Sequence, residues 1–200
     1  MIPNFLFLLL ALALLFLPVT LFYSTSVQRV LSRQYRSDEF KLKEFFLAWQ
    51  NGLDLIRGFA GTYILVNWVL PLEPVADEKV TSGHIWAAAI LTVAVLIQTV
   101  RFRRRLYLLA PVFFLWGITV ALSPAPPAFY AIALGLITVV MSNNIELNFP
   151  VMTVVLGVSG FFLSGADVLV AINCALILLP YLIMLGSKRS MAFFMRTIPR

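Results

Sequence analysis

The feature that most limits how this chain folds is a series of seven hydrophobic runs, each about 15 to 22 residues long. A helix needs roughly 20 residues to cross the hydrocarbon core of a bilayer, which is about 30 Å thick. The runs therefore predict membrane-spanning helices over residues 2–23, 53–72, 85–100, 106–122, 128–142, 149–164 and 166–185.

The composition agrees with a membrane protein, because 61% of the residues are hydrophobic and only 12% are charged. These values are far from the averages of soluble domains. The net charge of +6 does not indicate nucleic-acid binding, because nearly every cation lies beside a hydrophobic run, where anionic lipid headgroups are the nearer partner. The single cysteine, Cys174, lies inside a run and cannot form an internal disulfide.

Basic residues indicate the orientation, because loops rich in Lys and Arg are retained in the cytoplasm. Seven alternating crossings place fourteen of the 15 basic residues on one side and leave Lys79 alone on the other. The sequence therefore predicts an all-α, polytopic transmembrane bundle of about seven spans, with its amino terminus outside and its carboxyl terminus inside. We expect it in a plasma membrane, such as the bacterial inner membrane. Spans 128–142 and 149–164 are short, so five spans plus a re-entrant pair are an alternative with the same orientation.

The chain divides within a single membrane domain, residues 1–200. Its parts are the first span (1–23), a basic cytoplasmic linker (24–57), the remaining spans (58–186) and a basic cytoplasmic tail (187–200). No Lys or Arg precedes the first run and no small-x-small cleavage site follows it. We therefore interpret this run as a retained span rather than as a secretory signal.

Residues 37–57 of the linker predict an amphipathic helix. Its apolar residues share one face, namely Leu42, Phe45, Phe46, Trp49, Leu53 and Ile56, and its polar residues fall mostly off that face. Such a helix lies in the membrane interface, with its cations toward anionic headgroups. A docking face for a partner subunit is the alternative. Residues 191–195 of the tail, where two Phe lie between basic residues, predict a second anchor of the same type.

These features predict contacts with the lipid bilayer, including anionic headgroups, and with protein partner subunits, but none with nucleic acid. The residues expected to contact anionic lipid or a partner are Arg29, Arg33, Arg36, Lys41, Lys43, Phe45, Phe46, Trp49, Arg101, Arg103, Arg104 and Arg105.

Neutral polar residues inside the spans form a second candidate site. Asn67, Ser159 and Asn173 lie about five to seven residues from the outer ends of their spans, roughly 7 to 10 Å deep. Asp167 and His84 lie just above this layer. Asn67, Ser159, Asp167 and Asn173 therefore predict a shallow, outward-facing substrate site. The alternative is structural: each amide or hydroxyl bonds a neighbouring helix, at about 0.6 kcal/mol per contact.

Several chemistries are not expected from the sequence. Ionisable residues deep in spans usually mark function, but Arg57 is expected to snorkel to the inner interface, so a proton pump with a buried carboxylate relay is disfavoured. Residues 157–160 match the Gly-x-Ser-Gly pattern of rhomboid-type proteases, yet no His follows Ser159 to accept its proton. No carboxylate pair, His and Cys cluster or Gly-rich phosphate loop is present, so we expect no catalytic residues, metal or other cofactor.

Three functions remain open. The first is a non-catalytic subunit or scaffold of a larger membrane assembly, indicated by the aromatic-rich surface and the basic linker. The second is a small-solute transporter or channel that uses the polar layer near the outer face. The third is an intramembrane enzyme acting on lipid through His84 or Asp167.

Overall fold

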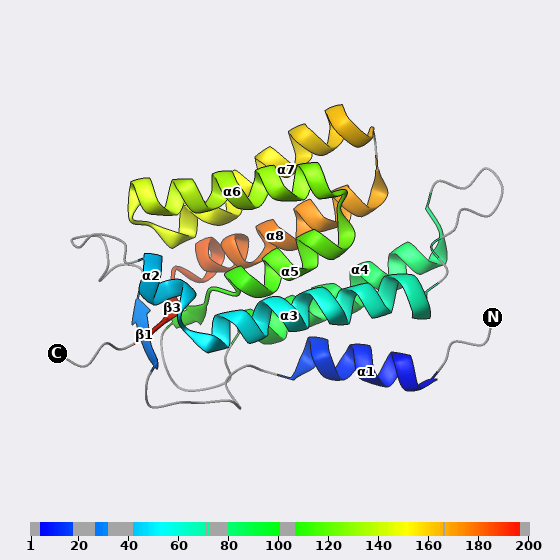
Figure 1. The fold of residues 1–200 in the computed structure, drawn as a ribbon, viewed down its shortest axis with the longest axis horizontal. Coiled ribbons are helices and arrows are strands. Elements are labelled where there is room, and N and C mark those ends of the chain that lie inside the picture. Colours follow the sequence, from blue (N-terminus) through cyan, green and yellow to red (C-terminus); the bar gives the residue numbers. More distant parts are fainter. Residues whose placement is uncertain are drawn as a thin grey trace.

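The computed structural model describes residues 5–17, 27–31, 42–70, 72, 80–100, 107–165 and 167–196. In these ranges the chain is mainly helical (Figure 1). The longer helices are α1 (Phe5–Phe16), α3 (Trp49–Ile64), α4 (Ser82–Thr99), α5 (Val112–Leu122), α6 (Ala125–Ser142), α7 (Asn148–Ser164) and α8 (Val168–Ser187). Shorter segments are α2 (Leu42–Phe46), the π-helix η3 (Leu65–Val69), which continues α3, and the 3₁₀-helix η4 (Ile145–Leu147).

Four segments of the described chain are long and apolar enough to cross a membrane. They are α4, α6, the segment Ile145–Ser164 formed by η4 and α7, and α8, each of 18 to 20 residues. Eighteen residues of helix extend about 27 Å, close to the thickness of the hydrocarbon core. The predicted class, a helical fold compatible with membrane insertion, is therefore confirmed.

The lengths of individual helices differ from the predicted spans. α6 and the segment Ile145–Ser164 come from the two short runs, and each is long enough for a full crossing. α1 has only 12 residues and α5 only 11, so both are shorter than predicted. In the sequence, Pro18 comes two residues after the end of α1, and Pro111 immediately precedes α5. Proline limits a helix because it lacks a backbone N–H and clashes with the preceding turn.

Capping residues account for the connections of the last helices. α6 begins with prolines in its first turn, where a missing N–H costs no helical bond. It ends at Asn143, which is left-handed with φ 51°. Asp167 caps α8, since its Oδ1 accepts a hydrogen bond from the Leu169 amide at 2.8 Å. Gly165, with φ 77°, turns the chain between α7 and α8, which pack as antiparallel neighbours.

Helices α3 and α5 make the most extensive contact in the described bundle. A Cβ added at Gly58 of α3 would lie 2.3 Å from the carbonyl oxygen of Phe114, and one at Gly117 of α5 would lie 2.3 Å from that of Leu55. The two backbones therefore touch where the helices cross, as small residues allow in membrane bundles. Figure 1 shows α6 and α7 above α5 and α8, with α3 and α4 below them and α1 at the bottom.

A three-stranded sheet lies at one end of the bundle beside α2, and it was not predicted (Figure 1). Its strands are β1 (Val27–Leu31), β2 (Tyr107–Leu109) and β3 (Ser190–Arg196), in the order β1-β3-β2. β1 pairs antiparallel with β3, Val27 opposite Arg196, and β2 pairs parallel with β3, Leu109 opposite Ala192. The prediction of a helical anchor at residues 191–195 is therefore wrong, because this segment is the central strand.

The linker helix also differs from its prediction. Instead of one helix over residues 37–57, the structure has α2 and α3 separated by a break at Leu47 and Ala48. Residues 37–41 lie outside the described ranges. Across the break, the side-chain amide of Asn51 donates a hydrogen bond to the carbonyl oxygen of Phe45 at 2.7 Å. This bond links α2 to α3 across the break.

Candidate functional site: a buried ion pair beneath the first helix

Helix α3 turns its polar face inward and its apolar face outward. Its buried residues include Gln50, Asn51, Asp54 and Arg57, whereas Trp49, Ile56, Phe59 and Tyr63 are exposed. A surface helix of a water-soluble protein has the opposite arrangement. In a bilayer the surrounding solvent is apolar, and ionisable residues face the interior of the bundle.

Asp54 and Arg57 form an ion pair on this inner face. Arg57 Nη1 lies 3.1 Å from Asp54 Oδ1, and each of the two residues is only 6% exposed. The residues are three positions apart, so both side chains project from the same side of the helix. The guanidinium carbon of Arg57 also lies 5.9 Å from the ring centroid of Phe114 on α5, within the range of a cation–π contact.

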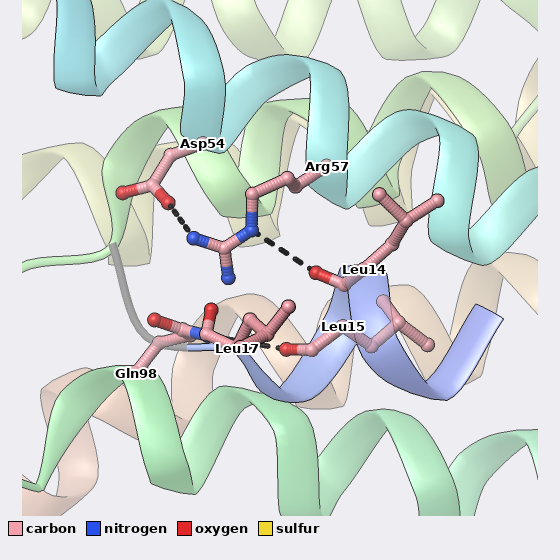
Figure 2. Close-up of polar contacts among 6 residues, drawn as sticks. All are labelled: Leu14, Leu15, Leu17, Asp54, Arg57 and Gln98. Carbon is pink, nitrogen blue, oxygen red and sulfur yellow. Dashed lines mark hydrogen bonds and ion pairs between the residues drawn. The ribbon is translucent and has the colours of Figure 1, made fainter. Parts of the chain in front are cut away.

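The pair is joined to the carboxyl-terminal end of α1 (Figure 2). Arg57 Nε donates a hydrogen bond to the carbonyl oxygen of Leu14 at 3.1 Å. From α4, the side-chain amide of Gln98 donates to the carbonyl oxygens of Leu15, at 3.1 Å, and Leu17, at 3.3 Å. The last carbonyls of a helix have no partner within it, so side chains from two other helices satisfy those of α1.

The charges of this cluster are mutually compensating. The cation of Arg57 lies between the carboxylate of Asp54 and the negative end of the α1 dipole. Removing one member of such a buried pair typically costs about 3–5 kcal/mol, because an uncompensated charge remains. One donor stays unused: Arg57 Nη2 is buried and has no hydrogen-bond partner within the described part of the chain.

The cluster offers groups suited to binding and positioning. An arginine and an aspartate that neutralise each other supply hydrogen bonds and a local dipole, but no activated nucleophile. No group of three or more His, Cys, Asp or Glu residues suited to a metal ion occurs among the described residues. We call Asp54, Arg57, Gln98 and the carbonyls of Leu14, Leu15 and Leu17 the polar cluster.

Sequence reasoning missed the polar cluster. Arg57 was expected to snorkel to the inner interface, but Arg57 and Asp54 are both buried. A usable signal existed, namely two opposite charges three residues apart within a hydrophobic run. Gln98, near the end of another run, gave no sign of its contact with α1.

The four predicted substrate-site residues have separate hydrogen-bond partners in the structure. Asn67 is exposed and donates to the carbonyl of Tyr63 in its own helix, at 3.0 Å. Ser159 likewise donates to Val155 at 2.6 Å. Asp167 caps α8.

Asn173 is the member of this set that links two helices. It is fully buried, and its amide donates to the hydroxyl of Ser123 at the end of α5, at 2.8 Å. Its Oδ1 also accepts a longer hydrogen bond, of 3.4 Å, from Thr119. No hydrogen bond joins any two of the four predicted residues, all of which are described.

The predicted lipid or partner contacts have different surroundings. Phe45 is only 1% exposed and packs against Phe113 and Phe193, with ring centroids 4.9 and 5.9 Å apart. It therefore packs in the interior of the described bundle. Phe46, Trp49 and Lys43 are exposed. Arg29 lies in β1 without a described side chain, and the remaining predicted contacts lie outside the described residues: Arg33, Arg36, Lys41, Arg101, Arg103, Arg104 and Arg105.

His84, considered for lipid chemistry, has a structural partner. Its Nδ1 accepts a hydrogen bond from the backbone N–H of Thr81, at 3.1 Å, in a capping box at the start of α4.

Comparison with known proteins identifies no relative: no family model, curated protein or solved structure matches this chain.

Proposed function

We propose that this chain is a multi-pass integral membrane protein that acts as a non-catalytic subunit or scaffold of a larger assembly in a plasma or bacterial inner membrane. The observation that carries the proposal is the inverted face of α3. A helix that buries Asp54 and Arg57 while exposing Ile56 to 61% suits an apolar surrounding. In water the same arrangement would expose apolar surface and bury charge, both of which are unfavourable.

The proposed topology has seven crossings, with the amino terminus outside and the carboxyl terminus in the cytoplasm. Its support is the charge distribution, with fourteen of 15 basic residues on one side under alternating crossings. The sheet adds a second argument, because β1 and β3 come from the linker and the tail, which this topology assigns to the cytoplasm, and β2 lies at the cytoplasmic end of the fourth predicted span. Strands that pair with one another must lie on one side of a membrane.

The outward face of α3 is the proposed contact with a partner subunit. Trp49, Ile56, Phe59 and Tyr63, which we call the outer stripe, are separated by seven, three and four positions and are all exposed. Phe59 and Tyr63 stack with ring centroids 5.8 Å apart. Aromatic residues are enriched at protein interfaces, where they supply large and rigid contact areas. The proposed occupant is a transmembrane helix of a different subunit.

A second candidate function is transport of a small solute, and one observation favours it. Buried ionisable residues in membrane helices often line substrate or ion pathways, and the polar cluster is such a group. The polar cluster therefore replaces the layer of Asn67, Ser159 and Asn173 as the site to test. If liposomes containing the wild-type protein take up a solute, the Asp54→Asn/Arg57→Gln variant should lose that uptake; unchanged uptake would exclude the cluster from the pathway.

Affinity isolation in mild detergent tests the subunit proposal. The wild-type protein should carry a stoichiometric companion, identified by mass, and Ile56→Ala/Phe59→Ala should reduce its recovery by about tenfold, as for loss of a binding hot spot. Val154→Ala/Phe162→Ala is the matched control, because both residues are exposed on α7, away from the outer stripe. A monodisperse monomer without a companion would contradict the proposal. Equal loss in both variants would remove the outer stripe as the contact.

A further inference from the structure

Arg57 has hydrogen-bonding capacity that its described partners do not use. Arginine presents five N–H donors in a planar fork. Nε bonds to Leu14 and Nη1 to Asp54, but the buried Nη2 has no partner in the described residues. Figure 2 shows Nη2 directed away from the carboxylate of Asp54, toward Leu17 and Gln98. A buried charged donor without an acceptor requires an explanation, such as an ion or ligand.

The position of Arg57 indicates where such a ligand comes from. α1 ends at Phe16, and its last carbonyls bond to Arg57 and Gln98. Gln98 itself precedes the last residue of α4. The carboxyl-terminal ends of α1 and α4 therefore both lie close to Arg57. In a bilayer, the ends of spanning helices lie near the headgroup region, where the phosphates are.

We infer that Arg57 Nη2 binds a phosphate oxygen of an anionic phospholipid headgroup that enters between the ends of α1 and α4. A cationic donor favours an oxyanion acceptor, and the guanidinium fork suits phosphate geometry. Asp54 makes a single N–O contact and leaves Nη2 free. The sequence continues within a few residues of Gln98 into Arg101, Arg103, Arg104 and Arg105, a basic segment of the kind that concentrates anionic lipid.

This inference rests on the proposed membrane placement and is independent of the partner subunit. Inorganic phosphate has the same oxyanion chemistry, so the experiment must separate the two sources. A bound water molecule is the competing explanation for Nη2, since buried waters commonly satisfy polar groups in proteins.

Native mass spectrometry of the purified full-length chain provides the test. Phosphatidylglycerol and phosphatidylcholine with identical acyl chains are titrated separately, and the bound fraction gives an apparent dissociation constant for each. The wild-type protein should bind phosphatidylglycerol about tenfold more tightly than phosphatidylcholine. Asp54→Asn/Arg57→Gln removes both charges together, so that no uncompensated charge stays buried, and it should lose this preference.

Two further variants keep the test decisive. Arg57→Lys retains the charge but not the fork, and its affinity for phosphatidylglycerol should fall about threefold or more even if the double variant does not fold. Arg189→Gln removes an exposed cation that follows α8 and is not among the predicted lipid contacts, and this variant should bind as the wild type does. Thermal unfolding of each purified variant shows whether it is folded.

The outcomes separate the explanations. If both Arg57 variants bind phosphatidylglycerol as tightly as the wild type, the inference is overturned. Inorganic phosphate could raise the unfolding temperature of the wild type but not of Asp54→Asn/Arg57→Gln, while phosphatidylglycerol leaves the unfolding temperature of both proteins unchanged. That result would overturn the lipid as the source of the phosphate. Loss of lipid binding with an unchanged companion in affinity isolation supports this inference independently of the subunit proposal.

Discussion

Replacing Gly58 by alanine perturbs the crossing of α3 and α5 at a point where two backbones meet. The added Cβ would lie 2.3 Å from the carbonyl oxygen of Phe114, whereas ordinary contacts begin at 3.4 Å. No rotamer change relieves this clash, because the Phe114 atom belongs to the backbone, so the helices must separate by about 1 Å. Overpacking of this kind typically costs about 1–3 kcal/mol. We expect the free energy of unfolding to fall by about 1 kcal/mol after the better helix propensity of alanine, worth about 1 kcal/mol, is subtracted.

Gly52→Ala is the matched control on the same helix. A Cβ at Gly52 meets nothing within 4 Å, so the substitution should stabilise α3 by up to about 1 kcal/mol. Both variants are unfolded by denaturant in mixed micelles and followed by tryptophan fluorescence. Equal stability of Gly58→Ala and Gly52→Ala would refute the backbone contact between α3 and α5.

Three other substitutions test the buried polar contacts. Asp54→Ala should lower the free energy of unfolding by about 3–5 kcal/mol, whereas Asp54→Asn/Arg57→Gln should cost less, because no charge is left alone. Asn173→Ala should cost about 1 kcal/mol, and adding Ser123→Ala should cost little more, since both changes remove the same hydrogen bond. His84→Ala should cost about 1 kcal/mol and speed amide exchange in the first turn of α4, because a helix cap is lost.

Each of these predictions has a contradicting result. If Asp54→Ala were as stable as Asp54→Asn/Arg57→Gln, the charge of Arg57 would not depend on Asp54 for compensation. Additive losses at Asn173 and Ser123 would mean that the two side chains act separately. Unchanged exchange at the start of α4 would remove His84 from the cap.

Run length and hydropathy were sufficient to predict α4, α6, α7 and α8. Each is formed by a run of apolar residues with turn or capping residues at its ends, such as Asp167 before α8. These signals depend only on neighbours in the sequence. α1 was predicted less well, because hydropathy continues past Phe16 although the described helix ends there.

The sheet could not be predicted in the same way. β1 and β3 pair residues as distant as Val27 and Arg196, and β2 has only three residues. Strands this short have no distinctive periodicity, and their stability comes from partners elsewhere in the chain. The aromatic tail residues therefore resembled an amphipathic anchor.

The polar cluster was missed for a different reason. The periodicity of α3 correctly separates an apolar face from a polar face, but it does not say which face is inside. That depends on the surroundings, since water favours the polar face outside and a bilayer favours the apolar one. Arg57 was consequently expected at the inner interface and not in the interior of the bundle.

Photocrosslinking from the outer stripe tests directly whether α3 contacts a partner subunit. Benzoyl-phenylalanine is placed in native membranes at Phe59 of α3 and, as a matched control, at Phe162 of α7, which is 79% exposed. A discrete protein adduct is expected from position 59 and only lipid adducts from position 162. Lipid adducts alone from both positions would contradict the assignment of this chain as a subunit that docks through α3.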